Sequence, residues 1–128
     1  MRRQGLKEDI EELLMNLKEK TWGDILGVAV VRPDGTVMAS ALPREIGEKR
    51  FAAMALVVLG TANRVCDELG AGNMVQVIID GSKMKAILMS AGEKALLAVL
   101  ASKDANVKSA LSEMKRASIE VKKVMAKY

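Results

Sequence analysis

The sequence predicts a three-layer α/β/α domain, in which helices cover both faces of a five-stranded, mostly antiparallel sheet. Three observations lead to this prediction. Amphipathic helical patterns occur at the start, in the middle and at the end of the 128-residue chain. Short segments of β character, separated by turn residues, lie between these patterns. One such segment, residues 95–101, is apolar on both faces, as expected for a central strand covered above and below.

The first part of the chain predicts a helix followed by a hairpin. Over residues 5–20, leucine and isoleucine recur at helical spacing while four carboxylates face away from them. An apolar, partly β-branched strand is expected over residues 25–31. The sequence Arg32-Pro33-Asp34-Gly35 is typical of a turn, and a second strand follows over residues 36–40. Pro43 then ends this strand and leads toward the second helix.

The middle helix, predicted over residues 46–69 and ended by the glycines of residues 70–72, is apolar on two sides. One stripe has the spacing of a face that packs on a core: Phe51, Ala55, Val58, Ala62, Val65 and Leu69. On the opposite side, the early turns carry another apolar set: Ala53, Leu56, Val57 and Gly60. A helix that is apolar on both sides must bury both. Because one layer of the domain covers only the first side, we expect a partner on the second.

The second half of the chain predicts a hairpin and then the central strand. Strands are expected over residues 74–79 and 83–90, on either side of Asp80-Gly81, the strongest short hairpin signal in the sequence. A turn at residues 91–93 leads into the apolar strand 95–101. If the two terminal helices share one face of the sheet, the middle helix covers the other face alone.

The last helix is basic, and either Asp104 or Asn106 can cap its N-terminus. Its apolar stripe consists of Val107, Leu111, Met114, Val121 and Met125. The net charge of +4 belongs to this segment, whose basic residues include Lys108, Lys115 and Lys122 at intervals of seven, with Arg116 and Lys123 beside them. Such a face could meet nucleic acid, an acidic membrane or an acidic protein. No aromatic residues accompany the charges, which favours a solvated outer face.

The composition excludes several chemistries. The chain contains no histidine, which removes the usual general base, the histidine-dependent triads and ordinary zinc sites. The single cysteine, Cys66, cannot form an internal disulfide, and with no signal peptide it indicates the reducing cytoplasm. The apolar run 51–60 is too short for a membrane span, which needs about 20 residues. The carboxylates of the first helix lack a rigid ligand loop. We therefore expect no catalytic residue, metal or cofactor.

Several local signatures accompany this order of elements. In the first hairpin they are Gly27-Val28-Ala29-Val30-Val31, then Asp34-Gly35 and Ala39-Ser40; further along are the alanine-rich middle helix, the Asp80-Gly81 hairpin, Asp104-Ala105-Asn106-Val107 and Met114-Lys115-Arg116-Ala117. Together they resemble the roadblock/dynein-light-chain family over almost the whole chain. The resemblance implies that residues 1–128 form a single roadblock-like domain of profilin-like type.

The resemblance also implies how two copies would meet. Family members pair their middle helices and the strand that follows, which joins two sheets into one. In this chain, the resemblance assigns the following residues to the interface: Ala53, Leu56, Val57, Gly60, Met74, Val75, Val77 and Ile79. The spacing of the helix residues agrees, because Ala53 and Gly60 are small enough to let two helices approach closely, with Leu56 and Val57 packing between them.

Family members commonly serve as platforms or regulators of small Ras-like GTPases, some as activators, or as scaffold and motor subunits. We therefore predict a cytoplasmic, non-enzymatic homodimer that regulates such a GTPase. Residues 70–72 lack the Gly-Lys-Ser/Thr of a phosphate-binding loop, so this chain is not expected to be the GTPase. Arg44, Arg50 and Arg64 are candidates for contact with the partner or its phosphates. Stabilisation of the GTPase's own switch loops is the preferred mechanism.

Two alternatives remain open from the sequence. The basic last helix could make the protein a module for nucleic acid or acidic membranes, with affinity falling steeply as salt rises. Alternatively, a pocket beside the sheet could sense a small molecule, although few polar residues lie in the predicted core to orient one.

Overall fold

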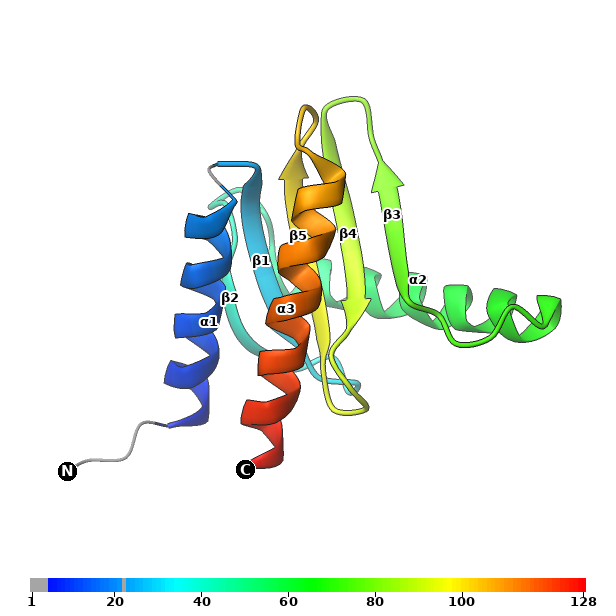
Figure 1. Cartoon of the computed structure of the whole chain (residues 1–128), viewed down its shortest axis with the longest axis horizontal. Helices are drawn as coiled ribbons and strands as arrows, with labels where there is room; N and C mark the ends of the chain where they lie inside the picture. The colour runs from blue at the N-terminus through cyan, green and yellow to red at the C-terminus, as the bar shows by residue number, and fades with distance from the viewer. Residues whose placement is uncertain (1–4, 22) are drawn as a thin grey trace.

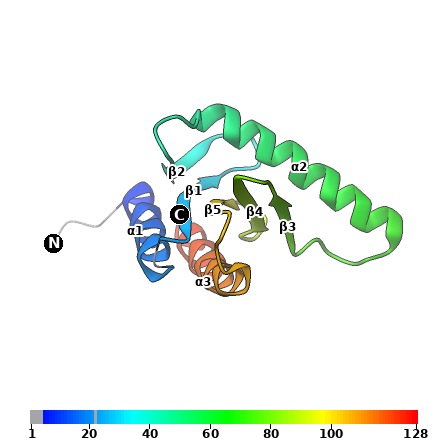
Figure 2. The ribbon, with the colours of Figure 1, turned by 90° about the horizontal axis from the view of Figure 1, so that it is seen from above.

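The computed structural model describes residues 5–21 and 23–128 and shows a five-stranded sheet with helices on both faces (Figures 1 and 2). The elements are α1 Leu6–Lys20, β1 Ile25–Val31, β2 Val37–Ala41, α2 Glu48–Leu69, β3 Gln76–Asp80, β4 Met84–Ser90, β5 Leu96–Ser102 and α3 Val107–Ala126. This order and the three-layer architecture confirm the predicted fold class. The predicted boundaries differ from the observed ones by one or two residues.

The strands lie in the order β2-β1-β5-β4-β3, and every neighbouring pair is antiparallel. The apolar strand β5 occupies the centre, as its sequence predicts, and every residue from Leu96 to Ala101 is buried. The two edges are β2 and β3. The β3–β4 hairpin closes through a longer loop than its Asp80-Gly81 signal suggests, because Asp80 still pairs with Lys85 and the Gly81 amide donates to the Met84 carbonyl at 3.1 Å.

Short polar interactions set the ends of the elements. In the first hairpin, the Asp34 carboxylate accepts a hydrogen bond from the Thr36 amide at 2.9 Å, and this interaction lowers the pKa of Asp34. At the end of α2, Gly70 takes a left-handed conformation with φ of +63°, which an L side chain would resist. The Asn106 side chain caps α3 by accepting from the Ser109 amide at 3.0 Å, so Asn106 is the capping residue.

One face of the sheet is covered by α1 and α3, which lie side by side (Figure 2). Their buried faces and the strands beneath form a large core. Its fully buried large side chains include Ile10 and Leu14 from α1, Met114 from α3, and Val28 and Leu97 from the sheet. The expected apolar stripes of both terminal helices therefore pack where the sequence places them.

The other face is covered by α2 alone, and its core is much smaller. Only Ala52 and Ala55 of this 22-residue helix are buried, against Ala29, Ala98 and a few larger side chains of the sheet. The larger side chains of α2 that reach this core, such as Phe51 and Leu56, remain half-buried. The small side chains of Ala52 and Ala55 thus let α2 pack close to the sheet, but they form only a thin hydrophobic core.

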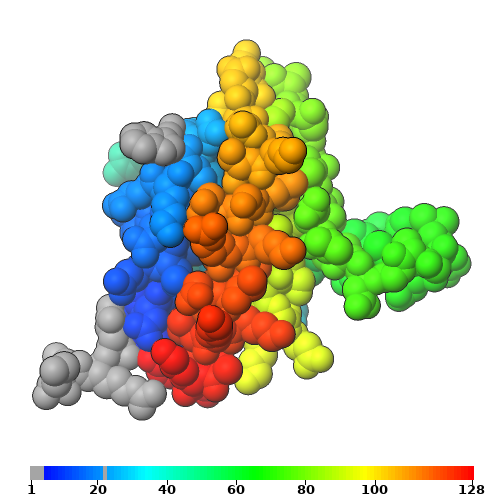
Figure 3. Space-filling view, in the orientation of Figure 1, coloured from blue at the N-terminus to red at the C-terminus, as the bar shows by residue number. Residues whose placement is uncertain are grey.

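The helix α2 runs across the strands and extends past the β3 edge (Figures 1 and 2). Its 22 residues span about 33 Å. Five strands, spaced at about 4.8 Å, span only about 19 Å between the first and the last. A helix of this length laid across such a sheet must overhang it, and the space-filling view shows the C-terminal part of α2 as a projecting arm (Figure 3).

In residues 5–21 and 23–128, none of the helices combines the length and apolar character needed to cross a lipid bilayer.

Candidate functional site

The helix α2 and the neighbouring edge strand, with the segment before it, carry most of the large apolar side chains that the described part of the chain exposes. We call this region the α2–β3 surface. Its large exposed apolar side chains are Met54, Val57, Val65 and Leu69 from α2, and Val75, Ile78 and Ile79 from β3 and the segment before it. Val57 is 69% exposed and Leu69 is 75% exposed. Isolated exposed apolar residues are ordinary, but a concentration on adjacent elements marks an interaction site.

The outer side of α2 has the composition that a close helix contact requires. Arg50, Ala53, Val57, Gly60 and Arg64 are exposed and follow one another at spacings of three and four, so they form one stripe. The centre of the stripe is small or apolar, and arginines stand at its two ends. At Gly60, an added Cβ would meet nothing within 4 Å, so none of the residues placed in the structure requires a glycine there. A second helix packed closely on the stripe would leave no room for a side chain at this position and so would require a glycine.

Among the described residues, β4 is the only strand that pairs with β3, so the outer edge of β3 is unpaired there. Exposed edges of this kind pair readily with another strand. Alternation along the strand places Val77 and Ile79 on the α2 side, opposite Leu88 and Ala86. Ile78 faces the other way, since its partner Ile87 belongs to the core beneath α1 and α3. An added strand at this edge would extend both layers.

Some expectations for the predicted interface residues need correction. The helical spacing predicts that Val65 and Leu69 face this chain's own core, but they are exposed, because α2 has left the sheet by that point. It predicts that Leu56 faces outward, but Leu56 is half-buried and packs against the small core under α2, with its Cδ1 close to Gly35. Val77 is also half-buried against this core. Ala53, Val57, Gly60, Val75 and Ile79 are exposed, and Met74 is half-buried.

The three candidate arginines are all exposed. Arg44 lies in the loop before α2, Arg50 in the first turn of α2, and Arg64 on its overhanging part. Among the interactions of the described residues, none of the three takes part in an ion pair or a side-chain hydrogen bond. Arg50 and Arg64 belong to the same stripe as Val57, whereas Arg44 lies off the helix. The fold therefore does not bring the three together into one site.

The charged groups that the sequence singles out elsewhere are solvated. The basic residues of α3 are exposed, and Lys123 makes an exposed ion pair with Glu120 at 3.5 Å. The carboxylates of Glu8, Glu11 and Glu12 are also exposed. No group of three or more histidine, cysteine, aspartate or glutamate side chains with the arrangement of a metal site occurs among the residues placed in the structure.

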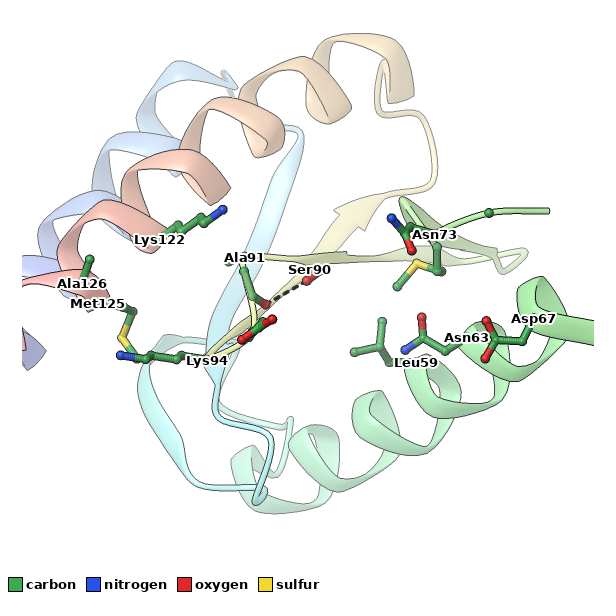
Figure 4. A pocket seen from close by; sticks show the side chains of 14 residues that line it. Leu59, Asn63, Asp67, Asn73, Ser90, Ala91, Lys94, Lys122, Met125 and Ala126 are labelled. Carbon is green, nitrogen blue, oxygen red and sulfur yellow. Dashed lines mark hydrogen bonds between the residues drawn. The ribbon is translucent and has the colours of Figure 1, made fainter. Parts of the chain in front are cut away.

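An open cleft of about 750 Å³ lies at the end of the sheet where β4 turns into β5 (Figure 4). Leu59, Asn63 and Asp67 of α2 line one side of it, and Lys122 and Met125 of α3 line the other. Its lining carries two carboxylates, from Asp67 and Glu93, and two ammonium groups, from Lys94 and Lys122. Because these charges balance, the cleft shows no preference for an anionic or a cationic ligand.

Sequence reasoning left open a pocket beside the sheet but could not place this cleft, because its lining comes from four separate segments. It also missed Met54 and Ile78 as exposed apolar residues of the α2–β3 surface. Met54 lies beside Ala53 and one helical turn before Val57, so helical spacing could have predicted that Met54 is exposed. Ile78 lies between two residues assigned to the interface, and only its position at an uncovered edge exposes it.

Comparison with known proteins places this arrangement in a family. The model of the Roadblock/LC7 domain matches residues 9–101. Two uncharacterized proteins of Methanocaldococcus jannaschii are each 37% identical over 113 residues, covering 88% of this chain and 96% of theirs. The gliding protein MglB of Thermus thermophilus superimposes with a TM-score of 0.88 at 18% identity, covering 100% of this chain and 96% of MglB.

Two further structures show the range of the fold. An MglB structure described as having a tetrameric arrangement gives a TM-score of 0.86 at 18% identity, covering 97% of this chain and 93% of that one. Profilin II of Acanthamoeba castellanii gives a TM-score of 0.60 at 14% identity, covering 93% and 98%. The profilin-like character of the fold is thereby confirmed. The match of the domain model and the relatives in Methanocaldococcus jannaschii establish that this chain belongs to the Roadblock/LC7 domain family.

Proposed function

We propose that the protein is a homodimer, formed through α2 and β3, that serves as a non-enzymatic regulator of a small Ras-like GTPase. The observation that carries the proposal is the α2–β3 surface. An overhanging helix with a small and apolar outer stripe lies beside an unpaired edge strand. A second copy related by a twofold axis presents the same stripe and the same edge, so both can be covered at once.

The free energy of such an association is favourable. If each subunit covers about 400 Å² of apolar surface, about 800 Å² leaves water, which is worth about 20 kcal/mol at about 25 cal/mol/Å². This gross gain exceeds the association cost of about 4–15 kcal/mol. Neither Ala53 nor Gly60 blocks the approach of a second helix. Pairing of two β3 strands would in addition satisfy the free backbone groups at the sheet edge.

Membership of the family supports the regulatory role. Roadblock proteins commonly act as platforms or regulators for small Ras-like GTPases, and one MglB structure of this fold has a tetrameric arrangement. In this chain, a dimer would place two copies of the overhanging α2 side by side and so create a composite surface. Because the arginines are dispersed, we favour stabilisation of the GTPase's own switch loops over insertion of an arginine toward the nucleotide.

The dimer is tested by Val57→Asp, which puts a carboxylate at the centre of the α2 stripe. Sedimentation velocity should show that this variant is monomeric, or aggregated, at concentrations where the wild type is dimeric, because an unpaired charge cannot be buried at the contact. Met15→Asp is the matched control. Met15 is 52% exposed on α1, far from the stripe, so this variant should remain dimeric. A Val57→Asp variant that dimerises like the wild type would remove Val57 from the interface.

The partner is tested by recovery from cytosol of the source cell on immobilised protein, with GTP-loaded and GDP-loaded conditions compared. We expect recovery of a small GTPase that depends on the bound nucleotide. Single replacements of Arg44, Arg50 and Arg64 by alanine should leave any stimulated GTP hydrolysis within a few-fold of wild type. A loss on the order of 10³ for one of them would show that this arginine acts on the phosphates. Recovery of nucleic acid alone would contradict the proposal.

A further inference from the structure

A second candidate docking site lies on the opposite side of the sheet from α2. There, α1 and α3 leave the β3 edge uncovered (Figures 1 and 2). Between α3 and this edge runs a groove of about 480 Å³, which we call the α3 groove. Its lining comes from the segment before β3, the end of β4 and one side of α3 and consists of Met74, Val75, Gln76, Met89, Ser90, Lys108, Leu111, Ser112, Lys115, Ser118 and Ile119.

The floor and wall of the α3 groove are apolar. Ile119 on α3 is 48% exposed, and Leu111, about two turns earlier on the same helix, is half-buried. Met74 lines the groove from the strand side and is half-buried. On β3, Ile78 is exposed and faces the same side of the sheet, because its partner Ile87 lies in the core beneath α1 and α3. These side chains offer a strip of apolar surface along α3.

The rim of the groove is basic and contains no carboxylate. Lys108 and Lys115 are the charged residues of its lining. Lys122 continues the same stripe seven residues later and lines the adjoining cleft, which shares Met74 and Ser90 with the groove. All three lysines are exposed, and none pairs with a carboxylate among the ion pairs of the described residues. Lys108 and Lys115 therefore give the groove positive charge with no carboxylate in its lining, whereas Lys122 lines the cleft together with Asp67 and Glu93.

The remaining charges of α3 are on its other side. Glu113 and Glu120 line a hollow beside α1, together with Arg116. Lys123 pairs with Glu120. The charges of α3 are thus segregated: mixed charges lie toward α1, and lysines alone lie toward β3. A uniformly solvated helix face would not require this separation.

We infer that the α3 groove binds an acidic amphipathic helix of a partner protein. A helix placed beside α3, at the usual distance of about 8–10 Å between axes, would continue the layer of α1 and α3 over the uncovered edge. Its apolar side would cover Ile119, Leu111 and Ile78, and carboxylates flanking that side would face the lysines. The stripe from Lys108 to Lys122 spans about 21 Å, so the matching segment needs about 14 residues with acidic side chains about seven residues apart.

The shape of the site favours a protein helix over nucleic acid or a membrane. Proteins that bind single-stranded nucleic acid usually stack its bases on aromatic side chains, and the lining of the α3 groove contains no aromatic residue. A flat bilayer surface cannot enter a concave groove between a helix and a sheet. The inference goes beyond the proposed function, since the α3 groove and the α2–β3 surface lie mainly on opposite faces of the sheet and share Val75 at the edge.

The test uses the full chain and a fluorescein-labelled amphipathic peptide of about 21 residues, with leucines on one side and glutamates at seven-residue intervals beside them. A matched peptide carries lysines in place of the glutamates. Fluorescence anisotropy should show saturable binding of the acidic peptide and much weaker binding of the basic one. Equal binding of the two peptides, or no binding of the acidic peptide up to about 1 mM, would overturn the inference. Preferential binding to anionic lipid vesicles or single-stranded DNA would overturn it as well.

Two pairs of variants locate the binding site. The triple variant Lys108→Glu, Lys115→Glu and Lys122→Glu should weaken binding of the acidic peptide at least about tenfold, because three attractive pairs become repulsive. Its control, Arg116→Glu, Lys123→Glu and Lys127→Glu, makes the same change in net charge on the other side of α3 and at the residue that follows it, and should stay within about threefold of wild type. Equal losses in both variants would show attraction to the overall charge rather than binding in the groove.

The second pair tests the apolar floor. Ile119→Ser should weaken binding about fivefold or more, and Met15→Ser, at an equally exposed position on α1, should leave it unchanged. Unchanged binding in Ile119→Ser would contradict docking in the groove. Sedimentation velocity of the same wild-type sample reports the dimer separately from peptide binding, so failure of the dimer and failure of this inference can be distinguished.

Discussion

The two faces of the sheet are covered by very different amounts of protein. Two helices and a continuous set of large, fully buried side chains cover the face toward α1 and α3. The face toward α2 is covered by one helix that buries two alanines and then extends past the sheet. The face toward α1 and α3 therefore supplies most of the buried core of the subunit, whereas the face toward α2 supplies little. The first face builds the subunit, and the second leaves apolar surface for another molecule.

The largest expected effect on stability comes from a cavity on the thicker face. Leu97 is fully buried in the core beneath α1 and α3, so Leu97→Ala should lower the free energy of unfolding by about 3–4 kcal/mol. Leu56→Ala on the α2 face should lower it by about 1 kcal/mol in the monomeric Val57→Asp background, because Leu56 is half-buried. Urea unfolding measures both values. Equal losses at the two positions would mean that the α2 face contributes as much to the subunit as the other face.

Smaller effects are expected at Gly60, where one variant should stabilise the monomer and another should weaken the dimer. In the Val57→Asp background, Gly60→Ala should raise the free energy of unfolding by about 0.5–1 kcal/mol, because glycine is unfavourable inside a helix and an added Cβ meets nothing in this chain. Without the Val57 change, Gly60→Leu should weaken dimerisation measured by sedimentation equilibrium, since the bulk would separate two close helices. A Gly60→Leu dimer as tight as the wild type would place Gly60 outside the contact.

The smallest effect is expected at the β1–β2 turn, away from both faces. The hydrogen bond from the Thr36 amide lowers the pKa of Asp34 below its ordinary value of 3.8. Asp34 therefore stabilises the fold at pH values above about 4, and this contribution is lost as the pH falls through the lowered pKa. The difference in thermal midpoint between wild type and Asp34→Asn should shrink below about pH 4. A difference that stays constant across this range would contradict the assigned cause.

Much of the fold could be predicted from local pattern, because the relevant physics is local. The central position of β5 follows from its two apolar faces and the end of α2 from Gly70, whereas the sequence offered both Asp104 and Asn106 as caps of α3 and the structure selects Asn106. The overhang of α2 could not be predicted. The apolar spacing of Val65 and Leu69 is the same whether a sheet lies beneath them or not, and only the width of the sheet decides their exposure.

The same distinction holds for the two candidate sites. The outer stripe of α2, including Val57 and Gly60, could be predicted from helical spacing. The seven-residue repeat of Lys108, Lys115 and Lys122 is also visible in the sequence, but its place beside β3 depends on which part of the sheet α3 covers. That choice is made by tertiary packing, so the sequence indicates a basic face and the structure supplies the apolar groove next to it.

Sedimentation velocity of the wild-type protein over a wide range of concentrations decides whether one subunit leaves its α2 face incomplete. We predict a species of twice the 13.8 kDa chain mass that dissociates only on dilution. A protein that stays monomeric and fully folded at high concentration, with the α2–β3 surface exposed to water, would contradict the account.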